Sequence, residues 1–220
     1  MKPIRGLFFR DFEANYIPEI LEEIYKNKVY EPFLQGKKDL VMLDIGANVG
    51  LWTFYAYKYA KKIYSVEPSE EHFQCLALML VSNEMTNVVP IKQAISNENG
   101  KATFYHNNNT TMYSLNKAVS TGELKESEEV ETITLDKFFK DNDIEHVDFM
   151  KIDVEGAESL IFGSEGFDKV KDKIDMIVGE FHTWTGLNPE QFRNYFIDRD
   201  WTFRWLNQTS ATIFCAERKQ

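Results

Sequence analysis

The sequence predicts an α/β fold, in the form of a doubly wound, mostly parallel seven-stranded sheet with an antiparallel C-terminal hairpin strand. Short apolar segments alternate with helical patterns from residue 39 onward, which is typical of parallel sheets covered by helices on both faces. A glycine-rich turn follows the first of these segments. Two strand patterns joined by a polar turn close the chain, and they account for the antiparallel hairpin.

The first half of the expected sheet contains strands at 39–45, 62–68 and 88–95, and helices at 51–60 and 69–83. Ser69 is expected to cap the second helix, because a serine side chain accepts a hydrogen bond from a free N–H group of the first turn. Pro90 has no N–H to donate, which disfavours a central position for the third strand.

The second half contains strands at 146–156, 173–181, 201–206 and 211–217, and helices at 157–163 and 188–200. The stretch 96–131 is the most polar part of the chain, and its charge run is expected to form a solvated loop or helix. Strand-like pieces at 102–105 and 130–135 flank and interrupt it, so we do not expect a linker between domains.

The segment before the first strand, residues 1–39, is expected to be helical. Its part ANYIPEILEEIYKNK has the pattern of an amphipathic helix, interrupted by Pro18. We expect this segment to pack on the sheet or to cover the site, and we place the main domain at 40–220.

Composition and charge narrow the classes of function. The formal net charge of −10 disfavours a nucleic-acid partner, because phosphate neutralisation needs clustered Lys and Arg. No window reaches the roughly 18 apolar residues of a membrane span. Cys75 and Cys215 lie far apart, which fits reduced thiols. We therefore expect a cytoplasmic protein, and its oligomeric state stays open.

The first motif is DIGANVG, in which Asp44, Gly46 and Gly50 mark the turn after the first strand. Ligands of open α/β sheets bind beyond the carboxyl ends of the strands, and glycines allow a sharp turn and a close approach to the backbone. The spacing differs from GxGxxG, the dinucleotide fingerprint. An acid before the first glycine would repel a pyrophosphate and attract a cation, such as an α-ammonium or sulfonium group.

The second motif is Glu67, which ends the next strand. An acid about 20 residues after the first motif is placed to accept both hydroxyls of a ribose. The site therefore needs a ribose together with a group that bears positive charge and a carboxylate, and S-adenosylmethionine has all of these. The residues expected to bind it are Asp44, Gly46, Ala47, Asn48, Gly50, Glu67, Pro68, Gln93, Ala94 and Asp153, with Gln93 and Ala94 beside the adenine.

Three segments, DIGANVG, YSVEPSEEHF and VDFMKIDVEGAE, resemble the FkbM-type S-adenosylmethionine-dependent methyltransferases. The similarity continues through QAISNENGKATFY, NNTTMYSL, TITLDKFF and IVGEFH, and so spans roughly residues 40–182. The resemblance implies a Rossmann-like methyltransferase fold and O-methyl transfer, often to hydroxyls of sugars or other natural products. It therefore implies a carbohydrate or small glycoside as acceptor.

The reacting end of the site is expected where the fourth and fifth strands end. Side chains alternate between the two faces of a strand. In KIDVEGAE, Lys151, Asp153 and Glu155 are therefore expected to share one face, and in GEFH, Glu180 and His182 are expected to share one face. Methyl transfer to a hydroxyl requires removal of its proton, and Asp153 or His182 is expected to be the base. The expected catalytic residues are Asp153, Glu180, His182, Lys151 and Glu155.

Other roles are open for some of these residues. Lys151 could form an ion pair with a neighbouring carboxylate, and His182 could bond buried backbone or Trp184. Glu158 is expected to be a first-turn acid that faces the helix dipole. We expect no metal; if one is present, Mg²⁺ or Mn²⁺ would suit Asp153, Glu180 and His182.

The loop HNNNTTMYS is expected to fold over the acceptor, because its polar side chains suit a polyol. The residues expected to bind the acceptor are His106, Asn109, Thr111 and Ser114, and a plain solvated turn is the alternative. Methylation of a natural product, lipid, protein or RNA remains open. A nicotinamide-dependent oxidoreductase would need GxGxxG, and a cofactor-binding module without catalysis would not need acids at both strand ends.

Overall fold

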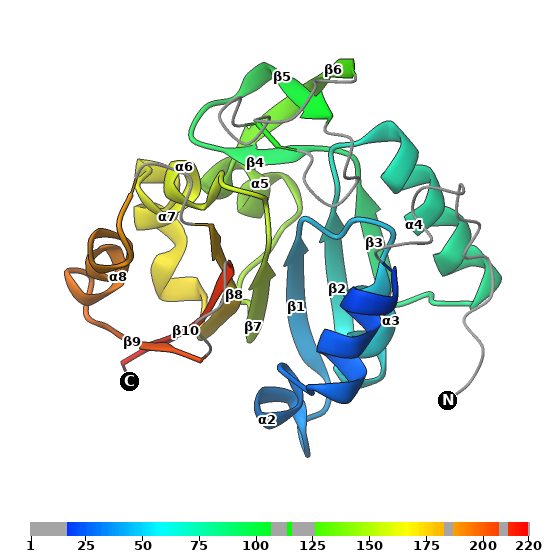
Figure 1. Cartoon of the computed structure of the whole chain (residues 1–220), viewed down its shortest axis with the longest axis horizontal. Coiled ribbons are helices and arrows are strands. Elements are labelled where there is room, and N and C mark those ends of the chain that lie inside the picture. Colours follow the sequence, from blue (N-terminus) through cyan, green and yellow to red (C-terminus); the bar gives the residue numbers. More distant parts are fainter. Residues whose placement is uncertain (1–16, 107–113, 116–125, 183–186, 207–210, 220) are drawn as a thin grey trace.

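The structure of the chain is a computed structural model that describes residues 17–106, 114–115, 126–182, 187–206 and 211–219. Its centre is a seven-stranded sheet in the order β3-β2-β1-β7-β8-β10-β9 (Figure 1). The strands are β1 (Leu40–Ile45), β2 (Ala60–Val66), β3 (Val88–Ile91), β7 (Phe149–Ile152), β8 (Met176–His182), β9 (Trp201–Trp205) and β10 (Ala211–Arg218). The predicted seven-stranded α/β sheet is confirmed.

Strands β3, β2, β1, β7 and β8 are parallel to one another. The closing hairpin is antiparallel as predicted, but its last strand does not form the edge. Strand β10 lies between β8 and β9 and runs antiparallel to both, so β9 is the edge strand. At the other edge, β3 contains Pro90, where its missing N–H costs no ladder hydrogen bond.

Helices cover both faces of the sheet (Figure 1). Leu43 points to the face that packs against α5 (Leu135–Asp141), α6 (Glu158–Phe162), α7 (Glu165–Val170) and α8 (Pro189–Ile197). Met42 points to the face that packs against α3 (Leu51–Ala56) and α4 (Glu70–Ser82), as the alternation of strand side chains requires. None of the helices that the structure describes is long and apolar enough to cross a membrane.

A second sheet lies above the carboxyl ends of β1 and β2 (Figure 1). Its order is β4-β6-β5, with β4 (Ala94–Ser96), β5 (Gly100–His106) and β6 (Glu126–Thr134). The prediction of a solvated loop or helix is wrong for the described part of the charge run, which lies in β6, whereas the strand-like pieces predicted at 102–105 and 130–135 do lie in β5 and, up to Thr134, in β6. Charged residues fit these strands because one face of an antiparallel sheet can meet water, while Phe104 and Val130 are buried.

The segment before β1 forms α1 (Ile17–Leu21), a π-helix at Glu22–Lys26 and α2 (Glu31–Leu34). Ile24, Tyr30 and Leu34 are buried against the same face as Met42 and Phe149. The helix expected at 14–28 was to be interrupted by Pro18, but α1 and the π-helix make the chain helical without a break from Ile17 to Lys26. The division into 1–39 and 40–220 stays a prediction.

Candidate functional site

The candidate site lies at the carboxyl ends of β1 and β7, the neighbouring strands at which the order of the sheet reverses. Ligands of doubly wound sheets bind at this point. Two cavities, a smaller and a larger one, adjoin there. They share four lining residues, Gly46, Asn48, Asp153 and Glu155.

The turn after β1 packs directly against the end of β7. Gly46 has a φ of +77°, and a Cβ at this position would lie 1.8 Å from the carbonyl oxygen of Asp153. Gly50 has a φ of +90°, and its Cβ would lie 2.4 Å from Met79 of α4. The two glycines are therefore required by neighbouring protein atoms, whereas the sequence predicted them for ligand approach.

Glu67 closes this turn. One of its carboxylate oxygens accepts from the backbone N–H of Asn48 at 2.8 Å, and the other accepts from the N–H of Ser69 at 2.9 Å. Glu67 is buried and lines the smaller cavity. Because each carboxylate oxygen has two lone pairs, the oxygen bonded to Asn48 retains one for a ligand, while the oxygen bonded to Ser69 also lies 3.7 Å from Nδ1 of His72.

The smaller cavity is mostly apolar. Of the predicted cofactor-binding residues, Pro68, Gln93 and Ala94 line it beside Glu67. The sequence reasoning missed several of its other walls, among them His72 at the start of α4, Phe104 of the second sheet and Leu115. An apolar residue within a polar stretch was the only available signal for Phe104 and Leu115.

Asp44 lies beneath the cavities and lines neither. It is fully buried, accepts from the Thr53 hydroxyl at 2.6 Å and lies 3.5 Å from the Lys151 ammonium. Burial raises the pKa of Asp44, while Lys151 and Thr53 oppose that shift. The cation that Asp44 attracts in this structure is thus Lys151, and the predicted contact with a ligand cation has no support from its position.

Lys151 connects the ends of β1 and β7. Its ammonium donates to the carbonyl of Gly46 at 2.8 Å and lies 3.6 Å from Asp153. Burial acts to lower the pKa of Lys151, but the carboxylates of Asp153 and Asp44 outweigh it and raise that pKa. Lys151 lines the larger cavity as a cation already held by two carboxylates.

The larger cavity is acidic. Glu23, Asp153, Glu155 and Glu180 line it together. Burial first, and Asp153 second, raise the pKa of Glu23 and of Glu180. Burial also raises the pKa of Glu155 to about 8, although His182 acts in the opposite direction. Glu23 was missed by the sequence reasoning, as were Tyr30 and Trp52, which also line this cavity.

His182 lies behind these carboxylates and lines neither cavity. Its Nδ1 lies 2.7 Å from a carboxylate oxygen of Glu158, and its Nε2 lies 3.3 Å from Glu155 and 3.7 Å from Glu180. Burial acts to lower the pKa of His182, but Glu158, Glu155 and Asp153 outweigh it and raise that pKa to about 10. Position and charge therefore oppose the predicted role of His182 as a base that touches the acceptor.

The same cluster was considered as a metal site. Asp153, Glu155 and His182 place one ligand atom each within 4.8 Å of one another. Both ring nitrogens of His182 face carboxylates, so both are donors and neither offers a lone pair to a cation. The geometry is that of an ion-pair cluster, and the conditional metal set of Asp153, Glu180 and His182 stays a prediction.

The expected acceptor loop is only partly described. The His106 ring contacts Glu128 at 2.9 Å across β5 and β6, and the Ser114 hydroxyl donates to the backbone carbonyl of Glu155 at 2.7 Å. Neither residue lines the two cavities. Asn109 and Thr111 lie outside the described residues, as does Trp184.

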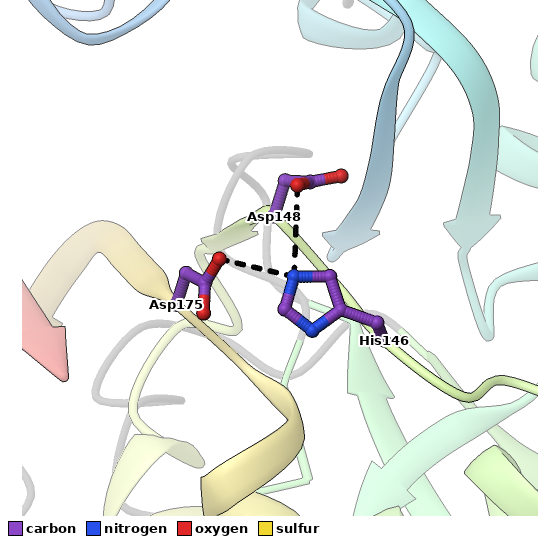
Figure 2. A group of neighbouring side chains, drawn as sticks. All are labelled: His146, Asp148 and Asp175. Atoms are coloured by element: carbon purple, nitrogen blue, oxygen red, sulfur yellow. Dashed lines mark hydrogen bonds and ion pairs between the residues drawn. The ribbon is translucent and has the colours of Figure 1, made fainter. Parts of the chain in front are cut away.

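A second cluster lies at the opposite end of the sheet. Figure 2 shows His146 between Asp148 and Asp175, with its Nε2 at 3.6 Å and 3.0 Å from their carboxylates. Asp148 also accepts from the N–H of Val41, and Asp175 accepts from Arg218. The two aspartates thus hold the starts of β1, β7 and β8 together, which is a structural role.

The raised pKa values predict how stability depends on pH. The pKa of Glu155 rises from 4.5 to about 8 and that of His182 from 6.5 to about 10, so the folded chain holds protons that the unfolded chain releases. The free energy of unfolding should therefore fall as pH rises through these windows, by at most about 1.4 kcal/mol per pH unit for each group.

Urea unfolding between about pH 5.5 and 9 measures this fall, a range above the usual titration of exposed carboxyls. Glu155→Gln should reduce the fall in the free energy of unfolding over the lower part of this pH range. Glu98→Gln, at an exposed acid, should leave the pH dependence as in the wild type. A stability that rises with pH across this range would contradict the assigned charges.

Comparisons with known proteins agree with this geometry. The family description "Methyltransferase FkbM domain" matches residues 44–204. The chain is similar to the M. capricolum TrmK structure with S-adenosyl-homocysteine, with a TM-score of 0.56 and 9% identity over 89% of this chain and 69% of that chain. It is also similar to a precorrin-6y C5,15-methyltransferase from Geobacter metallireducens, with a TM-score of 0.53 and 14% identity over 88% of this chain and 87% of that chain. No curated protein matched.

A third solved structure, an rRNA methylase from Streptococcus thermophilus, gives a TM-score of 0.51 and 12% identity over 84% of this chain and 89% of that chain. At such identities the likeness shows the fold alone. The printed names of these structures include a precorrin enzyme and an RNA enzyme, so one fold accommodates different acceptors.

Proposed function

This chain belongs to the FkbM methyltransferase family, and from that premise we propose that it transfers a methyl group from S-adenosylmethionine to a hydroxyl group of a sugar in a glycan or glycoside. Methyl transfer and S-adenosylmethionine follow from the family and from the fold. The sugar hydroxyl and the base are supported by the residues that line the two cavities.

The residues present fit the cofactor. The smaller cavity offers apolar walls for an adenine, and Glu67 offers a free lone pair for a ribose. The larger cavity begins at the turn after β1 and carries four carboxyl groups, and each of them that is ionised favours a sulfonium and an α-ammonium by charge. When bound, S-adenosylmethionine supplies an electrophilic methyl carbon on a positively charged sulfur.

Asp153 is the residue best placed to act as the base. It lines both cavities, and therefore lies where cofactor and acceptor meet. Burial raises the pKa values of Glu23, Glu155 and Glu180, the other acids of the larger cavity, which disfavours them as proton acceptors near neutral pH. Asp153 would take the hydroxyl proton as the oxygen bonds to the methyl carbon and the carbon–sulfur bond breaks.

The single observation that carries the sugar assignment is that three buried carboxyl groups, those of Glu23, Glu155 and Glu180, line this cavity together. Burial raises the pKa of Glu155 to about 8, so that Glu155 is mostly protonated at neutral pH, and burial raises the pKa of Glu180 as well. A protonated carboxyl both donates and accepts hydrogen bonds. Neighbouring hydroxyls of a sugar need both kinds of partner, whereas an apolar acceptor needs neither.

Two measurements test this function. In isothermal titration, S-adenosylhomocysteine should bind and NAD should not, because the turn after β1 lacks the pyrophosphate spacing. In a methyl-transfer assay with labelled S-adenosylmethionine, glycans and small glycosides should accept label, with and without EDTA. Label found only on RNA, protein or lipid offered in parallel would overturn the sugar assignment and leave the methyltransferase in place. Loss of transfer in EDTA alone would contradict our interpretation of the ion-pair cluster.

A further inference from the structure

Glu158 is a buried acid that the mechanism above does not use. It opens α6, is 0% exposed and lines neither cavity. The sequence predicted a first-turn acid that faces the helix dipole. Glu158 is indeed the first-turn acid of α6, as Glu165 is of α7, but Glu165 is exposed to solvent whereas Glu158 is buried. Full burial of a carboxylate is unfavourable unless it is paired, so the contacts of Glu158 require a different explanation.

One carboxylate oxygen of Glu158 joins two parts of the site. It lies 2.7 Å from Nδ1 of His182, at the end of β8. The same oxygen accepts from the backbone N–H of Gly156 at 3.3 Å and lies 3.5 Å from that of Val154. Glu158 thereby connects the end of β8 to the loop that carries Asp153 and Glu155.

The opposite nitrogen of the His182 ring faces the cavity acids. Nε2 lies 3.3 Å from Glu155, 3.7 Å from Glu180 and 4.0 Å from Asp153. Two further charged groups complete the surroundings, since Lys151 lies 3.6 Å from Asp153 and Glu23 hydrogen-bonds Glu180. The direction of one imidazole ring therefore affects the position of three carboxyl groups.

We infer that Glu158 is a positioning residue for methyl transfer, which fixes the orientation and the doubly protonated form of the His182 ring and, through that ring, the placement of Asp153, Glu155 and Glu180. The inference deepens the proposed function and rests on it. It assigns no contact between Glu158 and either substrate. The role resembles that of a carboxylate that orients a histidine by accepting from Nδ1.

Kinetics give the first test. Glu158→Gln keeps the shape of the side chain but removes its charge, and should lower kcat by about 10- to 100-fold, as is typical for a carboxylate behind the reacting groups. The affinity for S-adenosylhomocysteine should stay as in the wild type, because Glu158 lines neither cavity, whereas the KM for a glycoside substrate should rise, because Glu158 positions the acids that would bind its hydroxyls. Glu158→Asp should recover part of the loss. Glu165→Gln, the exposed first-turn acid of α7, is the matched control and should keep full activity.

The ring of His182 gives a second readout that needs no acceptor. In ¹⁵N NMR of the free protein at about pH 8, above the ordinary titration of histidine, both nitrogens of His182 should be protonated in the wild type and one in Glu158→Gln. His182→Gln identifies the signal by its loss. If no glycoside accepts a methyl group, the proposed acceptor fails while this spectrum still decides the role of Glu158.

The double variant separates positioning from general stability. If Glu158 acts through His182, adding Glu158→Gln to His182→Gln should cost no further activity. Fully additive losses would overturn the inference. A His182 ring that stays doubly protonated in Glu158→Gln would overturn it too.

Discussion

Replacing Asp153 with asparagine is expected to lower methyl transfer by about 10²- to 10⁴-fold, the usual contribution of a positioned base. Asparagine has nearly the same shape, so both cavities should keep their walls, but its amide cannot take the proton of a hydroxyl. Asp153 lines both cavities and lies 3.6 Å from Lys151. Binding of S-adenosylhomocysteine should persist, which separates loss of chemistry from loss of the cofactor.

The control for this prediction is Asp172→Asn, at an acid with 76% of its side chain exposed. It makes the same chemical change away from the cavities and should leave transfer intact. An Asp153→Asn protein with wild-type turnover would show that another group takes the proton. Parallel loss of turnover and of S-adenosylhomocysteine binding would instead assign Asp153 to the cofactor.

Gly46→Ala is expected to cause the largest loss of stability, about 3–5 kcal/mol, from left-handed backbone strain together with overpacking. The added methyl carbon would lie 1.8 Å from the carbonyl oxygen of Asp153. Backbone atoms cannot rotate away as a flexible side chain can, so β1 and β7 must move apart. Because the base lies at that same junction, residual activity should fall as well.

Gly36→Ala is a closely matched control. Its φ of +80° is nearly the same as that of Gly46, but a Cβ there would meet nothing within 4 Å. The control should therefore lose only the strain of a left-handed residue, about 1–2 kcal/mol. Urea unfolding of both variants measures the difference. Equal losses at the two positions would mean that the clash with Asp153 relaxes freely.

The sequence was enough to predict features that depend on local pattern. Strands of alternating or buried apolar residues predicted the seven-stranded α/β sheet, which the structure confirms. Ser69 caps α4 as predicted, with its hydroxyl accepting from the N–H of His72. The family motifs around Asp44 and Lys151 predicted the methyltransferase family and its cofactor, because these motifs occupy consecutive positions in the chain.

The surroundings of individual side chains depend on residues that are distant in the sequence, and the local pattern does not identify those residues. Asp44 was expected to meet a ligand cation, and the fold gives it Lys151 instead. Glu158 was expected as a first-turn acid that faces the helix dipole, and it does open α6, but the fold also buries it against His182. In both cases the local pattern identified a carboxylate correctly, and the partner came from a different strand.

The sequence by itself determined the fold class, the family and the positions of the acids at the strand ends. Only the tertiary structure decided which acids face a cavity, which are paired behind it, and that Glu23 and Phe104 contribute walls from outside the main sheet. The physical reason is that periodicity fixes which face of its own element a side chain occupies, whereas its charge state and partners depend on burial and on atoms that other elements bring within a few ångströms.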